Sequence, residues 1–151
     1  MPKHIKVDIQ VVEFHRGSTT LQNTEPMTIR IDGYVAKKRN NTREFVGNVH
    51  LPDELLPIPK DRRTVDISFD QHDAGSLIYS YVEDGYTKTF MYGTMFANDD
   101  FSKIAIMNTS TQKQGDLVTP LMLSGPATNQ EEALSISEEL MKDYLNSFPP
   151  K

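Results

Sequence analysis

Hydrophobic and polar residues alternate with a period of two along most of the first 125 residues. In the opening run, Ile5, Val7, Ile9 and Val11 share one face and the residues between them are mainly polar. Because successive side chains of a strand point to opposite faces, this pattern predicts strands with one buried face. The same alternation returns at 27–31, 45–51 and 65–69.

The clearest turn in the chain is Asp84-Gly85, which lies between two apolar and aromatic runs. This dipeptide is the strongest short-range signal for a hairpin with a two-residue loop. Counting outward from the turn predicts five cross-strand pairs: Val82 with Thr87, Ser80 with Thr89, Tyr79 with Phe90, Ile78 with Met91 and Leu77 with Tyr92.

This pairing separates the hairpin into two apolar faces. The predicted aromatic face carries Leu77, Tyr79, Tyr81, Phe90 and Tyr92. The predicted aliphatic face carries Ile78, Val82, Met91 and Met95. A third strand after the turn at 98–100 adds Ile104 and Ile106 to the aliphatic face, so that 76–107 reads as a three-stranded meander.

After residue 125 the hydrophobic period changes to that of a helix, predicted over 128–148. Thr128 and Glu131 fit a capping box at its start. One apolar stripe must pack against another apolar surface, and the aliphatic face of the meander is the predicted partner. The stripe contains Ala133, Ile136, Leu140, Tyr144 and Phe148, widened by Leu134, Met141 and Leu145.

The whole pattern predicts one mainly β (α+β) domain over 1–151. About eight antiparallel strands (β-rich 4–124) precede a single amphipathic helix (128–148) that packs on the sheet. A meander barrel of the ligand-carrier type and a sandwich both satisfy this order of elements.

Composition narrows the possible partners. A formal net charge of -5 argues against nucleic acid, which attracts proteins with basic surfaces. The basic clusters 37–39 and 62–63 are predicted to be solvated loops. The absence of cysteine and of any long apolar segment predicts a cytoplasmic protein without a membrane span, or an extracytoplasmic one if a leader or anchor has been removed.

Asp66, Asp70, His72 and Asp73 are the one cluster with the chemistry of a metal site. Aspartates before a glycine also stabilise turns, and the sequence favours that interpretation. No motif for a nucleophile or a phosphate loop occurs, so no catalytic residue, metal ligand or cofactor is predicted.

The runs Gly93-Thr94-Met95-Phe96 and Asn98–Lys103, with Leu123–Ala127 and Glu131-Glu132-Ala133 after them, form a recurring segment. It resembles small uncharacterised domains of Gram-positive bacterial proteins and implies no activity. Lipocalins share the barrel architecture but carry an early tryptophan, which this chain lacks.

The aromatic face is the remaining candidate site. Tyr79, Tyr81, Phe90 and Tyr92 are predicted to line a sheet face or a cavity that binds a small apolar or amphipathic molecule. The alternative is that these pairs only stabilise the sheet, in a domain that binds a protein partner or is structural. A metal-dependent enzyme at Asp66, Asp70, His72 and Asp73 is the third hypothesis.

Overall fold

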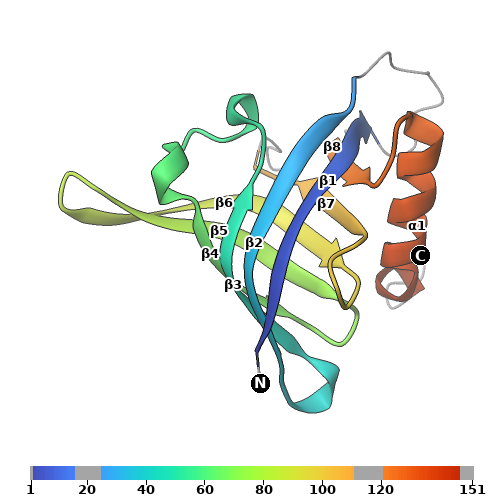
Figure 1. Ribbon diagram of the computed structural model, residues 1–151, viewed down its shortest axis with the longest axis horizontal. Coiled ribbons are helices and arrows are strands. Elements are labelled where there is room, and N and C mark those ends of the chain that lie inside the picture. The colour runs from blue at the N-terminus through green and yellow to red at the C-terminus, as the bar shows by residue number, and fades with distance from the viewer. Residues whose placement is uncertain (1, 16–24, 111–120, 147–151) are drawn as a thin grey trace.

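Eight antiparallel strands, joined in chain order, close into a barrel in the computed structural model, which describes residues 2–15, 25–110 and 121–146 (Figure 1). The strands are β1 (Lys3–His15), β2 (Met27–Lys37), β3 (Arg43–His50), β4 (Thr64–Phe69), β5 (Ala74–Glu83), β6 (Tyr86–Ala97), β7 (Ile104–Asn108) and β8 (Leu121–Gly125). A single helix, α1 (Gln130–Asn146), follows β8. The predicted fold class is confirmed, and of the two predicted architectures the structure has the barrel.

Closure of the barrel depends on β1, which is long enough to pair with two strands. Residues 3–11 pair with β2, and residues 12–15 pair with the last strand, β8. The two strands approach closely where β8 ends: a side chain at Gly125 would collide with the carbonyl oxygen of Gln10, which also accepts the backbone N–H of Ala127. Glycine at that position therefore lets the sheet close.

Inward-facing side chains from every strand fill the barrel. The predicted alternation in β1 is reproduced, since Ile5, Ile9 and Val11 are buried and Val7 packs against them. The interior also holds two large aromatic side chains, Phe45 and Phe69, that are essentially inaccessible to solvent. The barrel is therefore a packed core and not an open channel.

A buried arginine closes each end of this core. Arg43, at the start of β3, donates to the carbonyl oxygens of Ala97 (2.8 Å) and Asn98 (3.1 Å) and forms an ion pair with Asp73. Its guanidinium also lies 4.9 Å from the centre of the Phe69 ring, within cation–π range.

At the other end, Arg63 donates to the carbonyl oxygens of Ile58 and Leu51 and pairs with Asp53. These bonds fasten the β3–β4 connection, which contains two short 3-10 turns, η2 (Asp53–Leu55) and η3 (Lys60–Arg62). The prediction that 62–63 lies in a solvated loop is therefore wrong for Arg63, because its side chain is buried and donates to backbone carbonyl oxygens of the β3–β4 connection and of the residue that follows β3. Of the basic residues at 37–39 and 62–63, the rest are exposed.

The β5–β6 hairpin has the predicted turn and four of the five predicted pairs, but Leu77 faces Gly93 and not Tyr92. Tyr92 is the extra residue of a β-bulge. A side chain at Gly93 would overlap the carbonyl oxygen of Met107, so glycine permits β6 to approach β7 there.

The bulge moves every later residue of β6 to the opposite face. Met95 therefore points into the barrel, where Ile104 and Ile106 join it, while Met91 remains outside. The predicted aliphatic face that combined Met91 with these residues is wrong. Its outer part, Ile78, Val82 and Met91, is exposed.

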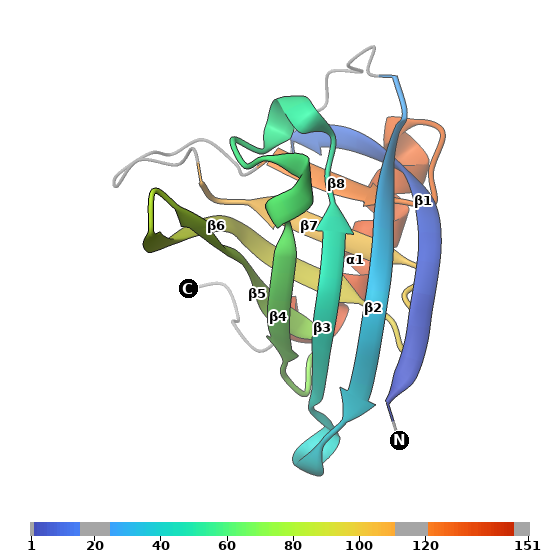
Figure 2. The same cartoon turned by 60° about the vertical axis from the view of Figure 1, so that its left-hand side comes forward.

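The helix packs elsewhere than predicted. It contacts β8, β1, β7 and β6, on the far side of the barrel from β3 and β4 (Figure 2). A second apolar cluster fills this interface, and its helical members include Ala133 and Met141. The barrel contributes Val12, Phe14, Phe96, Ala105 and Met122, all at most 1% exposed.

The helix begins at Gln130, two residues after the predicted start at 128, and its cap is shifted by one residue. The Asn129 side chain accepts the backbone N–H of Glu132 (2.8 Å), and the Glu132 carboxylate accepts the backbone N–H of Thr128 (2.8 Å). Asn129 and Glu132 therefore cap the helix in place of Thr128 and Glu131. The predicted end of the helix at 148 lies outside the described residues. Among the residues that the structure describes, no helix is both long and apolar enough to cross a membrane.

Candidate functional site

Five aromatic side chains form a row along the inner face of the β5–β6 hairpin. The four predicted residues belong to it, and strand alternation adds a fifth at the hairpin tip. We name this set the aromatic row: Tyr79, Tyr81, Tyr86, Phe90 and Tyr92.

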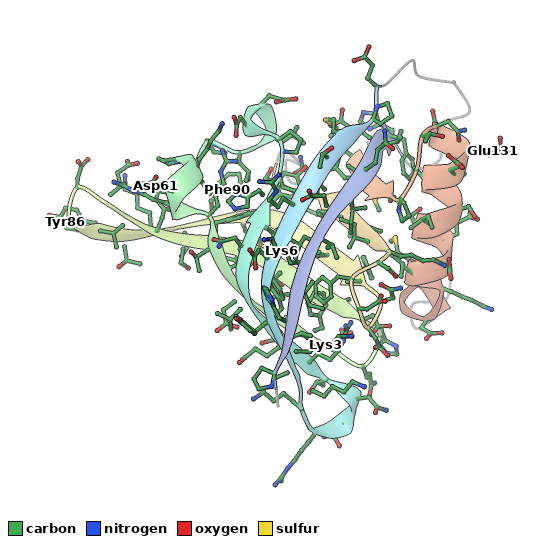
Figure 3. All side chains as sticks on the ribbon, viewed as in Figure 1. Lys3, Lys6, Asp61, Tyr86, Phe90 and Glu131 are labelled. Carbon is green, nitrogen blue, oxygen red and sulfur yellow. The ribbon has the colours of Figure 1, made fainter. Side chains whose placement is uncertain are left out.

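Exposure rises along the aromatic row from the barrel to the tip. Tyr79 and Tyr92 are completely buried in the barrel, Tyr81 and Phe90 are half-buried against its core, and Tyr86 is 73% exposed. Figure 3 shows Tyr86 at the far end of the hairpin and Phe90 between it and the barrel body. The row therefore leads from solvent into the core.

The hairpin extends beyond the barrel because its neighbours end early. β4 pairs with β5 at Tyr79, and β7 pairs with β6 from Gly93 onward. Within the described part of the chain, the strand residues of 80–91 pair only within the hairpin, and the carbonyl oxygen of Tyr92 accepts the backbone N–H groups of Thr109 and Ser110. The hairpin therefore leaves the barrel on the side opposite the helix (Figure 1).

The two buried tyrosines differ in their hydrogen bonds. The Tyr79 hydroxyl donates to the carbonyl oxygen of Val49 at 2.7 Å. The Tyr92 hydroxyl is equally buried and makes no well-formed hydrogen bond with a described atom, although the Asn108 side chain lies close enough to act on it as a hydrogen-bond partner. Burial raises the pKa of both phenols, and the nearby Glu13 carboxylate raises that of Tyr92 further, whereas the Asn108 side chain opposes the rise. Both therefore stay neutral, with one donor unused.

Glu13 reaches the same end of the barrel from β1. It continues the inward face of Val11 and is half-buried, and burial raises the pKa of its carboxyl, against the opposing charge of His15. The barrel mouth, defined here by Glu13, Tyr81, Phe90 and Tyr92, thus combines apolar ring surface with a carboxyl and a phenol. Such a set can hold the apolar body of a small molecule and orient its polar group.

Beneath the mouth the barrel is filled. Val49, Val65 and Leu77 are at most 2% exposed around the buried end of the aromatic row. A ligand would therefore sit at the mouth and against the hairpin, above the packed core.

Sequence reasoning missed Tyr86 and Glu13 as members of this site. The signal for each was present: the two-residue turn places Glu83 opposite Tyr86, and strict alternation carries the inward face of β1 from Val11 to Glu13. The sequence pattern did not indicate how deeply each of these side chains is buried in the barrel.

The cluster of Asp66, Asp70, His72 and Asp73, for which the sequence favours turn contacts over a metal site, makes contacts of the turn type at Asp70. Asp70 accepts the backbone N–H groups of His72 (2.8 Å) and Ala74 (3.1 Å), and Asp73 pairs with Arg43. Asp66 is exposed on β4. Within the described residues no group of three or more His, Asp or Glu side chains is arranged to hold a metal ion.

Comparison of the chain with protein-family models, with curated proteins and with solved structures finds no match. The resemblance to small Gram-positive domains therefore stays a prediction, and the function must be argued from the barrel mouth and the surfaces.

Proposed function

We propose that this protein is a non-catalytic binding module that holds a small amphipathic molecule at the barrel mouth. The observation that carries the proposal is the aromatic row, which passes from 73% exposed at Tyr86 to a fully buried phenol at Tyr92 that no described atom satisfies with a well-formed hydrogen bond. A packed core needs no such row outside the barrel.

The chemistry of the mouth defines the ligand class. Phe90 and Tyr81 offer ring faces that are half-buried before anything binds. Burying a fully exposed aromatic side chain contributes about 1.5–3 kcal/mol, and covering the part of each ring that is still exposed contributes a fraction of that. Glu13 and the Tyr92 hydroxyl lie beyond these rings, so the ligand would carry a hydroxyl or amine at the end that enters the barrel.

The test uses two neighbouring residues of β6 that face opposite sides. The uncharged fluorescent probe N-phenyl-1-naphthylamine is titrated into wild type, Phe90→Ala and Met91→Ala. Phe90 lies on the aromatic row, whereas Met91 is 49% exposed on the outer face. Loss of one ring contact is expected to weaken binding by about tenfold or more in Phe90→Ala, with Met91→Ala close to wild type.

Two results contradict the proposal. One is a wild type that does not increase the fluorescence of the probe at any concentration, and the other is a Met91→Ala variant that binds as weakly as Phe90→Ala. The second result would place the binding surface on the outer face of the hairpin.

That outer face supports a second candidate function, binding of a protein partner. Ile78, Val82 and Met91 lie together on it and are 36–57% exposed, because the helix packs on the other side of the barrel. Apolar groups gathered on one exposed face are typical of interaction surfaces. Light scattering over a range of concentrations tests whether the partner is a second copy of the chain. A dimer that Val82→Asp dissociates supports self-association through this face, and a monomer at every concentration excludes it.

A further inference from the structure

We infer that the end of the barrel opposite the mouth binds a small phosphate-bearing molecule. There Lys3, Lys37, Lys38 and Arg43 line a hollow of about 700 Å³ together with a single acidic residue, Asp99. A second hollow of about 340 Å³ shares Lys37, Lys38, Arg43 and Asp99 with it. This site is independent of the proposed function.

The strand register brings these cations together. Lys3 begins β1 opposite Val35 near the end of β2, and Lys37, the last residue of β2, pairs with Arg43, the first residue of β3. The four positive charges therefore come from three strands and, in the case of Lys38, from the connection after β2, and they meet at one rim of a chain whose formal net charge is -5. Such a concentration of positive charge at a concave surface attracts anions.

The lysines of this rim form no close ion pair with a described carboxylate, although Asp100 lies near enough to Lys3 to feel its charge. Among the described residues, Lys60, Lys88 and Lys103 each form an ion pair with a carboxylate. No such pair is formed by Lys3, Lys37 or Lys38 within the part of the chain that the structure describes, although Asp99 lines the same hollow. Three ammonium groups are therefore available to an anion.

Arg43 supplies a fixed donor at the base of the hollow. Three hydrogen bonds, to Ala97, Asn98 and Asp73, hold its guanidinium in place. A guanidinium has five N–H groups, so the described bonds leave two of them uncommitted. Arginine held in this way is suited to phosphate, because the geometry of its donors is already set.

The remaining lining residues indicate that the anion is part of an organic molecule. Pro2 and Ala36, with the small exposed part of Val35, give the larger hollow an apolar side. A bare ion would leave this surface uncovered, whereas a phosphomonoester with a small apolar group would cover it. We therefore take phenyl phosphate as the probe and inorganic phosphate as its reference.

Binding is measured by isothermal titration calorimetry at low salt, with the full chain. The test variant is Lys37→Gln/Lys38→Gln, which keeps Arg43 and its structural bonds. The control is Lys6→Gln, which removes an exposed lysine of β1 that lines neither hollow. Phenyl phosphate is expected to bind wild type and Lys6→Gln within about twofold of each other, and the double variant about tenfold or more weakly.

Each other outcome overturns part or all of the inference. If wild type binds neither phosphate, or if Lys6→Gln weakens binding as much as the double variant, the site is not there. If inorganic phosphate binds as tightly as phenyl phosphate, the apolar side has no role. If the protein binds phosphatidylglycerol vesicles and neither soluble phosphate, the cations contact a lipid surface instead.

Discussion

At the residue scale, the two buried tyrosines show how the same side chain acquires different roles in one core. Tyr79 and Tyr92 are both fully buried, but only Tyr79 makes a well-formed hydrogen bond, to the carbonyl oxygen of Val49, whereas Tyr92 has only the Asn108 side chain near its hydroxyl. A buried hydroxyl with a partner stabilises the fold, whereas one without a partner costs free energy unless something else satisfies it. The Tyr92 hydroxyl therefore lowers the stability of the fold, and a bound ligand that satisfied it would remove this cost.

We predict different costs for removing these two hydroxyls. Tyr79→Phe is expected to lower the free energy of unfolding by about 1–2 kcal/mol, because the Val49 carbonyl loses its donor inside the core. Tyr92→Phe is expected to change it by less than about 0.5 kcal/mol or to raise it. Urea denaturation measures both, and equal losses would show that Tyr92 has a partner in the folded protein.

Glu13 gives a pH-dependent prediction at the same scale. Burial raises the pKa of its carboxyl above the ordinary value of 4.5, so the folded state holds its proton more tightly than the unfolded chain does. The resulting stability is fully present below the ordinary pKa and is lost as the pH rises through the raised pKa.

Glu13→Gln is therefore expected to be more stable than wild type at neutral pH and to lose this advantage in acid. Urea denaturation of both proteins at about pH 4 and about pH 7.5 measures the difference. Glu25→Gln, at an exposed position before β2, is the control. An advantage for Glu13→Gln that is the same at both pH values would exclude a buried carboxyl as its cause.

At the level of single elements, the hairpin and the helix each agree with the sequence prediction except for one local change, a bulge in the hairpin and a shifted cap in the helix. The turn at Asp84-Gly85 and the pairs nearest to it are as predicted, because a two-residue loop fixes the register. The bulge at Tyr92 was not predictable from alternation, since it depends on the contact between Gly93 and β7. One inserted residue then exchanged the faces of Met95 and Phe96.

The start of the helix was likewise predictable in kind but not in its exact position. A capping box was predictable from the residue types, but two overlapping boxes fit the sequence, and the chain uses Asn129 with Glu132. The choice depends on where the connection from β8 leaves the barrel, and Ala127 bonds back to Gln10 there.

We predict that Asn129→Ala lowers the free energy of unfolding by about 1 kcal/mol, because the first turn of α1 loses an acceptor for one of its free N–H groups. Glu131→Ala, which removes the cap that the sequence predicted, is expected to cost less than about 0.5 kcal/mol. Thermal denaturation followed by circular dichroism compares the two. A larger loss in Glu131→Ala would restore the original assignment of the cap.

At the scale of the whole molecule, one barrel wall separates two apolar clusters. The inner cluster fills the barrel, and the outer cluster lies between α1 and the outer faces of β1, β6, β7 and β8. The helix covers one side of the barrel and leaves the outer face of the β5–β6 hairpin exposed. That arrangement places both candidate interaction surfaces on the hairpin.

A pair of aspartate substitutions tests the position of the helix. Ala105→Asp places a charge beneath α1 at a fully buried position and is expected to cost more than about 3 kcal/mol. Met91→Asp places the same charge on the face where the sequence predicted the helix, and since Met91 is 49% exposed, about 1 kcal/mol is expected. Urea denaturation measures both, and the reverse order would place the helix on the hairpin.

The strands, the hairpin turn, the single terminal helix and the inner face of β1 were all predictable, because each follows from alternation or spacing between near neighbours in the chain. Four features became known from the folded chain alone: the sheet closes, Tyr92 forms a bulge, the helix packs beside β8, and lysines from separate strands share a rim. These features depend on contacts between residues far apart in sequence, where small differences in packing select among arrangements that the local pattern allows equally. Tyr81 and Phe90 were therefore predictable as members of one face, whereas their place at the edge of a filled barrel was not.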